Sequence, residues 1–99
     1  MNASPSVPEV AQLVVELRRM IAHELDVRIQ ESDISDDISL LEGGLALDSI
    51  VLFEFIALIE KRFGFEFSDK GLSPETFASL TVLAQHIHGM AAQRQSAVA

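Results

Sequence analysis

The sequence predicts an all-α protein, a small bundle of three main helices plus one short helix, with a long ordered loop between helices one and two. Apolar residues recur at helical spacing in three separate segments. Capping residues precede these segments, and glycine or proline lies near their ends. The alternating run at residues 65–67 is too short to pair as a strand, so we read it as an extended connector. The length of 99 residues suits a single domain.

The first helix is predicted to begin near Ser6 and to run to about residue 25. Ser6-Val7-Pro8-Glu9 fits a capping box with a proline inside the first turn. The apolar residues that follow share one helical face. They are Val10, Leu13, Val14, Leu17, Ile21 and Leu25.

The loop between helices one and two covers residues 26–48 and has no hydrophobic periodicity. A loop of this length is unusual in a compact domain and is often functional. Isoleucine and leucine side chains recur along it, and we expect them to hold an ordered loop against the core. These are Ile29, Ile34, Ile38, Leu40, Leu41, Leu45 and Leu47.

The second main helix is predicted over residues 49–63. Gly64 follows it as a stop signal, and Lys61 and Arg62 in the last turn favour the helix dipole. Its expected core face consists of Ile50, Phe53, Ile56, Ala57 and Phe63.

The short helix is predicted to start at Ser73-Pro74-Glu75, with Phe77 as its inward anchor. The last main helix is expected to follow Ser79 as its cap. Its apolar residues are Val82, Leu83, Ile87 and Met90.

The ends of the chain look like disordered tails, residues 1–6 and 91–99, around a domain that spans residues 7–90. The first residues lack the basic and apolar regions of a signal peptide. The longest apolar run, residues 55–59, is far shorter than the roughly 20 residues of a membrane-spanning helix. We therefore expect a cytoplasmic protein without membrane insertion.

The composition excludes several classes of function. Seven Lys and Arg against 15 Asp and Glu give a net charge of −8, which argues against a nucleic-acid-binding protein. The same charge suits a partner with a basic docking face. The chain has no cysteine, which excludes disulfides, thiolate zinc sites and a cysteine nucleophile.

No metal site and no catalytic residues are predicted. The acidic run at residues 33–37 opens like a calcium loop, but Ile38 and Gly44 stand where such a loop needs glycine and glutamate. His86 and His88 are two residues apart and point to different sides of a helix. No Ser/His/Asp arrangement is readable, and so small a chain is not expected to form an enzyme's substrate cleft.

The remaining signal is Asp48-Ser49, between the Gly43-Gly44 loop and the second helix. Asp and Ser are favoured helix caps, and capping alone explains such a pair. Alternatively, Ser49 lies exposed at a helix N-terminus, where its hydroxyl can be modified by a phosphate ester that the helix end favours. The dipeptide by itself leaves both interpretations open.

The whole pattern from Leu41 to Ile87 resembles the acyl carrier protein family, a phosphopantetheine-binding carrier of the discrete, type II-like kind. In that family a Gly-rich loop ends in Asp-Ser followed by Leu, Ile or Met, as residues 43–50 do here. A glutamate five residues after the serine, apolar residues at fixed offsets and an ending like Glu-x-x-Phe-Gly follow. They stand here as Phe53, Glu54, Ile56, Ala57 and Glu60-Lys61-Arg62-Phe63-Gly64.

The resemblance implies that Ser49 receives 4′-phosphopantetheine from coenzyme A, through a separate phosphopantetheinyl transferase that supplies Mg²⁺. Asp48 would help to position Ser49 or the metal. The chain would then catalyse nothing itself and, as a monomer, hold an acyl-type group as a thioester. It would pass that group from an acyl- or aminoacyl-loading ligase to a downstream synthase or transferase of a specialised lipid or secondary-metabolite pathway.

The partner face implied by the resemblance lies on the second helix, and we assign it to Ile50, Val51, Leu52 and Glu54. Val51 and Leu52 belong to the core instead if the helix is rotated, because it is apolar over a broad arc. The family often has acidic residues where this helix is apolar, which indicates a dedicated set of partners. The acids gather upstream over residues 24–48, either as a solvated loop or as a docking surface.

The cargo is only indirectly indicated. The six phenylalanines would crowd a small core, which favours a short or polar cargo over a long alkyl chain. Two other functions remain open: an aminoacyl or peptidyl carrier loaded by an adenylating ligase, and an unmodified helical interaction module in which Asp48-Ser49 is only a cap.

Overall fold

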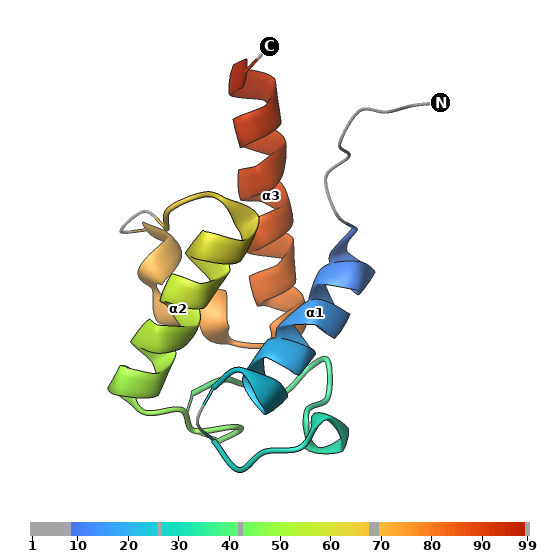
Figure 1. Cartoon of the computed structure of the whole chain (residues 1–99), viewed down its shortest axis with the longest axis vertical. Coiled ribbons are helices and arrows are strands. Elements are labelled where there is room, and N and C mark those ends of the chain that lie inside the picture. The colour runs from blue at the N-terminus through green and yellow to red at the C-terminus, as the bar shows by residue number, and fades with distance from the viewer. Residues whose placement is uncertain (1–8, 26, 42, 68–69, 99) are drawn as a thin grey trace.

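The computed structural model describes residues 9–25, 27–41, 43–67 and 70–98. Three α-helices follow one another, α1 (Val10–His23), α2 (Ser49–Phe63) and α3 (Leu80–Val98), with α3 between the other two in Figure 1. Short 3-10 turns stand between them, η1 (Glu31–Asp33), η2 (Lys70–Leu72) and η3 (Pro74–Phe77). The described residues contain no strand. The predicted all-α bundle with a long first loop is confirmed.

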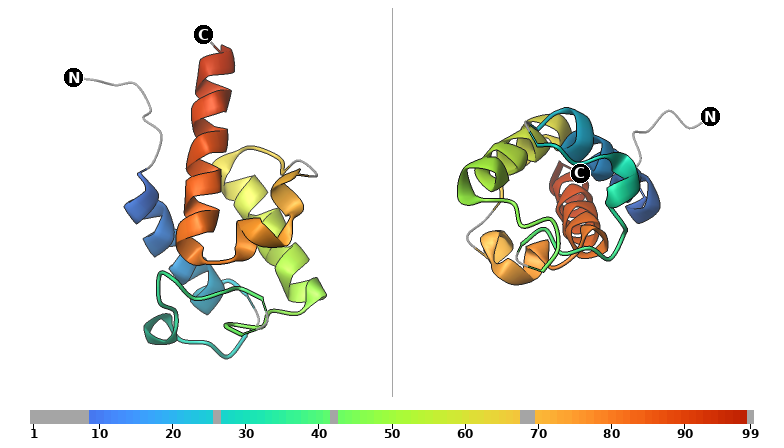
Figure 2. Two further views of the ribbon diagram at one scale, coloured as in Figure 1. Left: turned by 180° about the vertical axis from the view of Figure 1, so that it is seen from behind. Right: turned by 90° about the horizontal axis from the view of Figure 1, so that it is seen from below.

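A single apolar core joins the three helices. α1 and α3 pack directly against each other, and buried side chains of α2 complete the same core (Figure 2). The largest side chains with almost no exposed surface come from all three helices and from the loop. They are Leu13, Leu17, Met20, Ile21, Leu40, Phe55, Ile59, Leu80, Leu83 and Ile87.

The start of α1 differs from the prediction. Ser6, Val7 and Pro8 lie outside the described residues, and the helix begins at Val10 rather than near Ser6. Glu9 is extended, with φ −71° and ψ 153°, so it serves as the N-cap and cannot belong to the first turn. The side chain of Gln12 reaches back to the backbone N–H of Glu9 at 3.4 Å and completes a capping box one turn later than expected.

The bounds of α2 agree with the prediction, and Ile56 and Phe63 of its predicted core face meet the core, but the other three predicted core residues do not. Phe55, Ile56 and Ile59 are buried, whereas Ile50 is 79% exposed and Phe53 is 65% exposed. Ala57 is exposed as well. The helix is apolar on both sides, so hydrophobic periodicity alone could not decide which side meets α1 and α3.

The loop from residue 27 to residue 48 is held in place by polar contacts as well as by apolar side chains. Arg18 on α1 donates its Nε–H to the carbonyl of Ile34 at 2.8 Å and pairs with Asp36. The backbone N–H and the hydroxyl of Thr81 on α3 both donate to the carbonyl of Asp36, at 3.0 and 3.1 Å. The loop therefore bridges the C-terminal part of α1 and the start of α3, which makes it a fixed base for the residues that follow.

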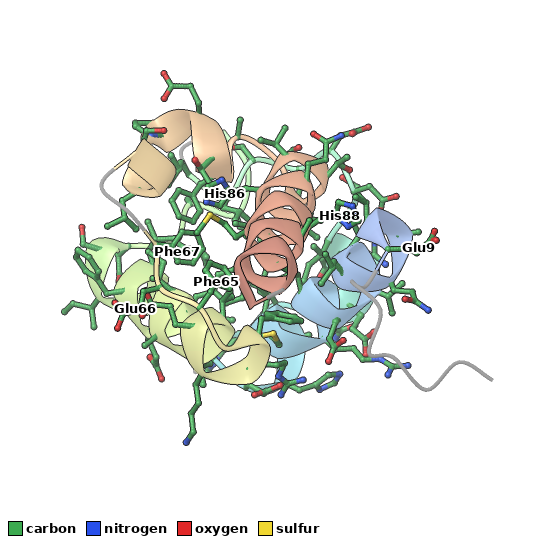
Figure 3. The ribbon with its side chains drawn as sticks, turned by 90° about the horizontal axis from the view of Figure 1, so that it is seen from above. Glu9, Phe65, Glu66, Phe67, His86 and His88 are labelled. Carbon is green, nitrogen blue, oxygen red and sulfur yellow. The ribbon has the colours of Figure 1, made fainter. Side chains whose placement is uncertain are left out.

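The segment after α2 folds as 3-10 turns instead of a short α-helix. Ser73 precedes Pro74 as expected, and Phe77 is buried, as its predicted role as an anchor requires. Phe67 stacks on His86 of α3 with ring centroids 5.4 Å apart, and Figure 3 shows the two side chains directed toward each other. Burial lowers the pKa of His86, so this ring is neutral at pH 7.

α3 is longer than the sequence predicts. It continues past Met90 to Val98, across most of the segment for which a disordered tail was expected, and its end projects beyond the other helices (Figure 1). The segment lacks an apolar stripe, but Ala91-Ala92 and the Gln and Arg residues that follow have high intrinsic helix propensity. A helix already formed by packing can extend through such residues at little cost, since only its nucleation is unfavourable.

Candidate functional site

Asp48 and Ser49 stand at the junction of the long loop and α2. Asp48 is the N-cap, and its Oδ1 accepts a hydrogen bond from the backbone N–H of Val51 at 2.9 Å. Its carbonyl accepts the first helical hydrogen bond, from the N–H of Leu52 at 2.8 Å. The capping interpretation of Asp48 is thus confirmed. Because Asp48 is the N-cap, Ser49 is not needed for capping.

Ser49 is the first residue of α2, and its side chain is exposed. Among the described residues its hydroxyl has no hydrogen-bond partner. The backbone N–H groups of Ser49 and Ile50 belong to the first helical turn, where no carbonyl of the helix can accept from them. An exposed hydroxyl next to unpaired N–H groups at the positive end of a helix dipole suits a phosphate ester on that hydroxyl.

Just before Ser49, the loop folds back on itself, and backbone hydrogen bonds join residues 39–40 to residues 45–47. We call this hydrogen-bonded part of the loop, residues 39–41 and 43–47, the clasp. The N–H of Leu45 donates to the carbonyl of Ser39 at 2.7 Å, and that of Leu47 donates to the carbonyl of Leu40 at 3.0 Å. Leu40 in turn donates its N–H to the carbonyl of Phe77 in η3 at 3.1 Å. The clasp fixes the chain direction just before Asp48, so Ser49 is presented from a rigid support.

Two residues of the clasp have left-handed backbones. Gly43 has φ +90°, which suits glycine, and Ala46 has φ +53°, which costs a residue with a Cβ about 1–2 kcal/mol. The alanine is tolerated here because its side chain is exposed and meets no steric limit beyond its own backbone.

The residues predicted as the partner face surround Ser49 unevenly. Ile50 and Glu54 are exposed, whereas Val51 and Leu52 are half-buried and pack against the core. Phe53 was expected in the core, yet it lies exposed one turn after Ser49, on the same side of the helix.

An apolar groove opens between α2 and the segment η2–η3, with a volume of about 290 Å³. Leu52 and Phe53 line it from α2, and Leu72 and Phe77 line it from the other side. Nothing in the sequence signals the part played by Leu72, because it belongs to a segment without periodicity. The groove begins within one helical turn of Ser49.

The acidic loop residues mostly have structural partners. Arg62 of α2 binds Glu24 at 2.6 Å and Glu16 at 3.0 Å, and Asp36 pairs with Arg18. His23 binds Glu31 at 2.7 Å, and this hydrogen bond lowers the pKa of the Glu31 carboxyl. Asp36 and Glu31 hold the loop to α1, whereas Glu16 and Glu24 join α1 to α2 through Arg62. The paired loop acids favour the interpretation of a solvated loop over that of a docking surface.

In the described part of the chain, no three His, Cys, Asp or Glu side chains are grouped closely enough to hold a metal ion. None of the helices described is long and apolar enough to cross a membrane.

Comparison with known proteins identifies one family. The profile of the family described as phosphopantetheine attachment site matches residues 15–87, from the middle of α1 to α3, which is most of the chain. No curated protein and no solved structure matches the sequence significantly. The matched segment contains the whole clasp, Asp48-Ser49 and all of α2. The chain therefore belongs to the family of phosphopantetheine attachment domains, which carry 4′-phosphopantetheine as a covalently bound cofactor.

Proposed function

We propose that Ser49 is the attachment residue and that the protein is an acyl carrier. The observation that supports this most strongly is the exposed Ser49 hydroxyl, which has no hydrogen bond among the described residues and starts a helix inside the family's matched segment. The unpaired first-turn N–H groups favour the negative charge of a phosphodiester at this point. The clasp fixes the backbone before Ser49, so the hydroxyl is held in one position for the transferase.

The attachment reaction belongs to a separate phosphopantetheinyl transferase. Ser49 Oγ attacks the phosphorus of coenzyme A that bears the pantetheine, a new Oγ–P bond forms, and the P–O bond to adenosine 3′,5′-bisphosphate breaks. The proton of the hydroxyl passes to a base of the transferase, where a bound Mg²⁺ would supply the charge stabilisation that the leaving phosphate needs. Asp48 keeps its Oδ1 on the Val51 N–H. Its other carboxylate oxygen would help to hold the Mg²⁺ that the transferase supplies.

The cofactor, when bound, supplies a flexible arm with a terminal thiol that holds the cargo as a thioester. The chain's own residues contribute a place to shelter that cargo. The groove between α2 and η2–η3 is lined by apolar side chains, and its volume of about 290 Å³ is at the small end for a ligand site. This supports an acyl-type cargo of short chain length, passed between a loading ligase and a downstream synthase or transferase.

The proposal is tested by intact mass after incubation with coenzyme A, Mg²⁺ and a phosphopantetheinyl transferase of broad specificity. We expect the wild type to gain one phosphopantetheine and Ser49→Ala to gain none, because Ser49 supplies the hydroxyl of the first residue of α2. Ser35→Ala removes an exposed loop serine and should leave the gain unchanged. A wild type that stays unmodified with several transferases would favour the interaction module, and modification of Ser49→Ala would move the attachment to another residue.

Asp48 allows a second prediction, because its two roles can be separated. Asparagine caps a helix as well as aspartate does, so Asp48→Asn should change the free energy of unfolding by less than about 0.5 kcal/mol. The loss of the carboxylate should nevertheless slow modification by about tenfold or more, as the loss of a group that orients a metal does. The measurement is the transferase rate at saturating coenzyme A, with Asp37→Asn as the control for an exposed loop carboxylate. An unchanged rate for Asp48→Asn would reduce Asp48 to a cap.

A further inference from the structure

His86 on α3 has a ring nitrogen that lies in the interior of the protein without a hydrogen bond. Its Nε2 is buried and has no hydrogen-bond partner among the described residues. A neutral imidazole can keep this nitrogen as an unprotonated acceptor, whereas in a protonated imidazole both nitrogens are donors and the ring is charged. Burying a charge without a partner costs far more than burying a neutral group. The position therefore favours the neutral form of His86 over the charged form.

The His86 ring is covered by the segment that follows α2. Phe67 stacks on it, with ring centroids 5.4 Å apart and planes only 13° from parallel (Figure 3). Gly71 in η2 approaches the edge of the ring so closely that a Cβ at this position would lie 2.6 Å from Nε2. Phe67 and Gly71 therefore have to move away from α3 before Nε2 can reach water.

Phe67 also supports residues on its other side. Its ring lies beside that of Phe77, with centroids 6.2 Å apart, and Phe77 lines the apolar groove next to α2. The carbonyl of Phe77 accepts a hydrogen bond from the N–H of Leu40 in the clasp at 3.1 Å. The N–H of Phe67 itself donates to Oε2 of Glu60 at 2.8 Å. A displacement of Phe67 thus affects both the groove and the clasp through direct contacts.

The elements packed around the His86 ring carry few charges that could pair with a proton on it. Their titratable groups are His88 on α3, Glu60 on α2, Glu66 in the connector, Lys70 in η2 and Glu75 in η3. Figure 3 shows His88 on the opposite side of α3, and Glu66 and Glu75 are exposed. Asp69 and the side chain of Lys70 lie outside the described residues. Burial lowers the pKa of His86, and no charge among the described residues opposes this effect.

We propose that His86 is an acid-sensitive latch that holds Phe67 and η2 against α3. In the closed state the neutral ring is covered by Phe67 and Gly71. When Nε2 takes a proton from solvent, the charged ring turns out to water, and Phe67 and η2 separate from α3. This opens the groove and loosens the hydrogen bond between Phe77 and Leu40. The latch is a property of the unmodified chain and does not depend on any group attached to Ser49.

The direction of the pH dependence follows from the burial of the ring. In the open state the imidazole faces water and has its ordinary pKa of about 6.5, whereas in the closed state its pKa is lower. The open state therefore binds more protons and gains population as the pH falls below about 6.5. The ratio of open to closed molecules rises by up to about tenfold for each pH unit, until the pH reaches the pKa of the closed state.

The experiment is hydrogen exchange of single amides, followed by NMR on the unmodified protein between about pH 5 and about pH 7.5. The reporters are the N–H groups of Phe67 and Leu40, because their hydrogen bonds break when the latch opens. After correction for the intrinsic pH dependence of exchange, their protection should fall by about tenfold or more toward the acid end. The N–H of Leu17, in the buried part of α1, should keep its protection, because the opening is local.

His86→Phe keeps an aromatic ring for the stack on Phe67 and removes the titratable group. In this variant the protection of Phe67 and Leu40 should be the same at both ends of the pH range. His88→Phe is the matched control, since it makes the same change two residues later on the opposite side of α3, and it should behave as the wild type does. Circular dichroism verifies that both variants fold. The NMR titration of the His86 ring in the wild type needs no variant, and its midpoint should lie below pH 6.5.

Three results would each overturn the latch. The first is a loss of protection that persists in His86→Phe, which would assign the pH dependence to another group. The second is a loss that Leu17 shares, since that would be global unfolding. The third is a midpoint for the wild-type His86 ring at or above pH 6.5, which would mean that water already reaches the ring. None of these results bears on the attachment of phosphopantetheine to Ser49, so the proposed function is tested separately.

Discussion

Replacing Phe55 by alanine is expected to lower the free energy of unfolding by about 3–5 kcal/mol. Phe55 has no exposed surface and belongs to the core that α2 shares with α1 and α3. The substitution removes a large buried apolar surface and leaves a cavity, because the surrounding helices can close it only in part. For a domain of this size, whose total stability is about 5–15 kcal/mol, such a loss brings the protein close to unfolding. Urea unfolding followed by circular dichroism measures the change.

Phe53→Ala is the matched control for Phe55→Ala, since the two residues have the same side chain in the same helix. Phe53 is mostly exposed, so its removal should change the free energy of unfolding by no more than about 0.5 kcal/mol. If Phe53→Ala proved the more destabilising of the two, α2 would be rotated about its axis so that Phe53, and not Phe55, faces the core.

Phe53 and Phe55 show which features of α2 can be predicted from the sequence and which cannot. The bounds of α2 were predictable, because Asp48 and Gly64 are local signals that act on their own backbone. The side of α2 that faces the core was not, because Phe53 and Phe55 lie on different sides of one helix and both are apolar. Which side of α2 is buried depends on where α1 and α3 pack against it, and this is determined by the tertiary structure and not by the local sequence.

The candidate site divides in the same way. Asp48-Ser49 was visible because a helix start and the Asp-Ser pair of the family resemblance coincide at the same residues. The contacts that hold the loop were not visible, since Arg18 reaches the carbonyl of Ile34 and Thr81 reaches that of Asp36 across large sequence separations. Leu72 joins the surface around Phe53 only through the path of the chain after α2. Spacing along the sequence contains no trace of these contacts.

Gly44→Ala is expected to destabilise the protein by about 2–4 kcal/mol and to slow its modification. A Cβ at this position would lie 2.0 Å from the carbonyl oxygen of Ser39 and 2.8 Å from its carbonyl carbon and its nitrogen. These are backbone atoms and cannot turn aside as a side chain does, so the loop itself must shift, at a cost of about 1–3 kcal/mol. The shift also disturbs the hydrogen bond from Leu45 to the same carbonyl, worth about 1 kcal/mol.

The effect on modification follows from the place of the clasp in the chain. The loop segment that begins at Gly44 ends at Asp48, the N-cap of α2. A shift of the clasp therefore changes the orientation in which Ser49 is presented at the start of α2. We expect kcat/KM of the transferase to fall for Gly44→Ala even at a temperature where the variant is fully folded. The two measurements are chemical unfolding and the initial rate of modification. A variant as stable as the wild type would show that the contact between Gly44 and Ser39 is looser than the structure has it.

Ala46→Gly is the control within the same loop, and it should change stability in the opposite direction. Its φ of +53° costs an alanine about 1–2 kcal/mol, and glycine removes that cost while losing about 0.5–1 kcal/mol more backbone entropy on folding. The balance is a gain of about 0.5–1 kcal/mol, with the direction of Ser49 preserved. Ala46→Gly is thus expected to stabilise the loop, and Gly44→Ala, two residues earlier, to destabilise it. Opposite effects at such close positions mean that the backbone conformation is fixed at each residue. That fixed path is what an enzyme acting on a single hydroxyl requires, because positioning the reacting group is where much of its rate comes from.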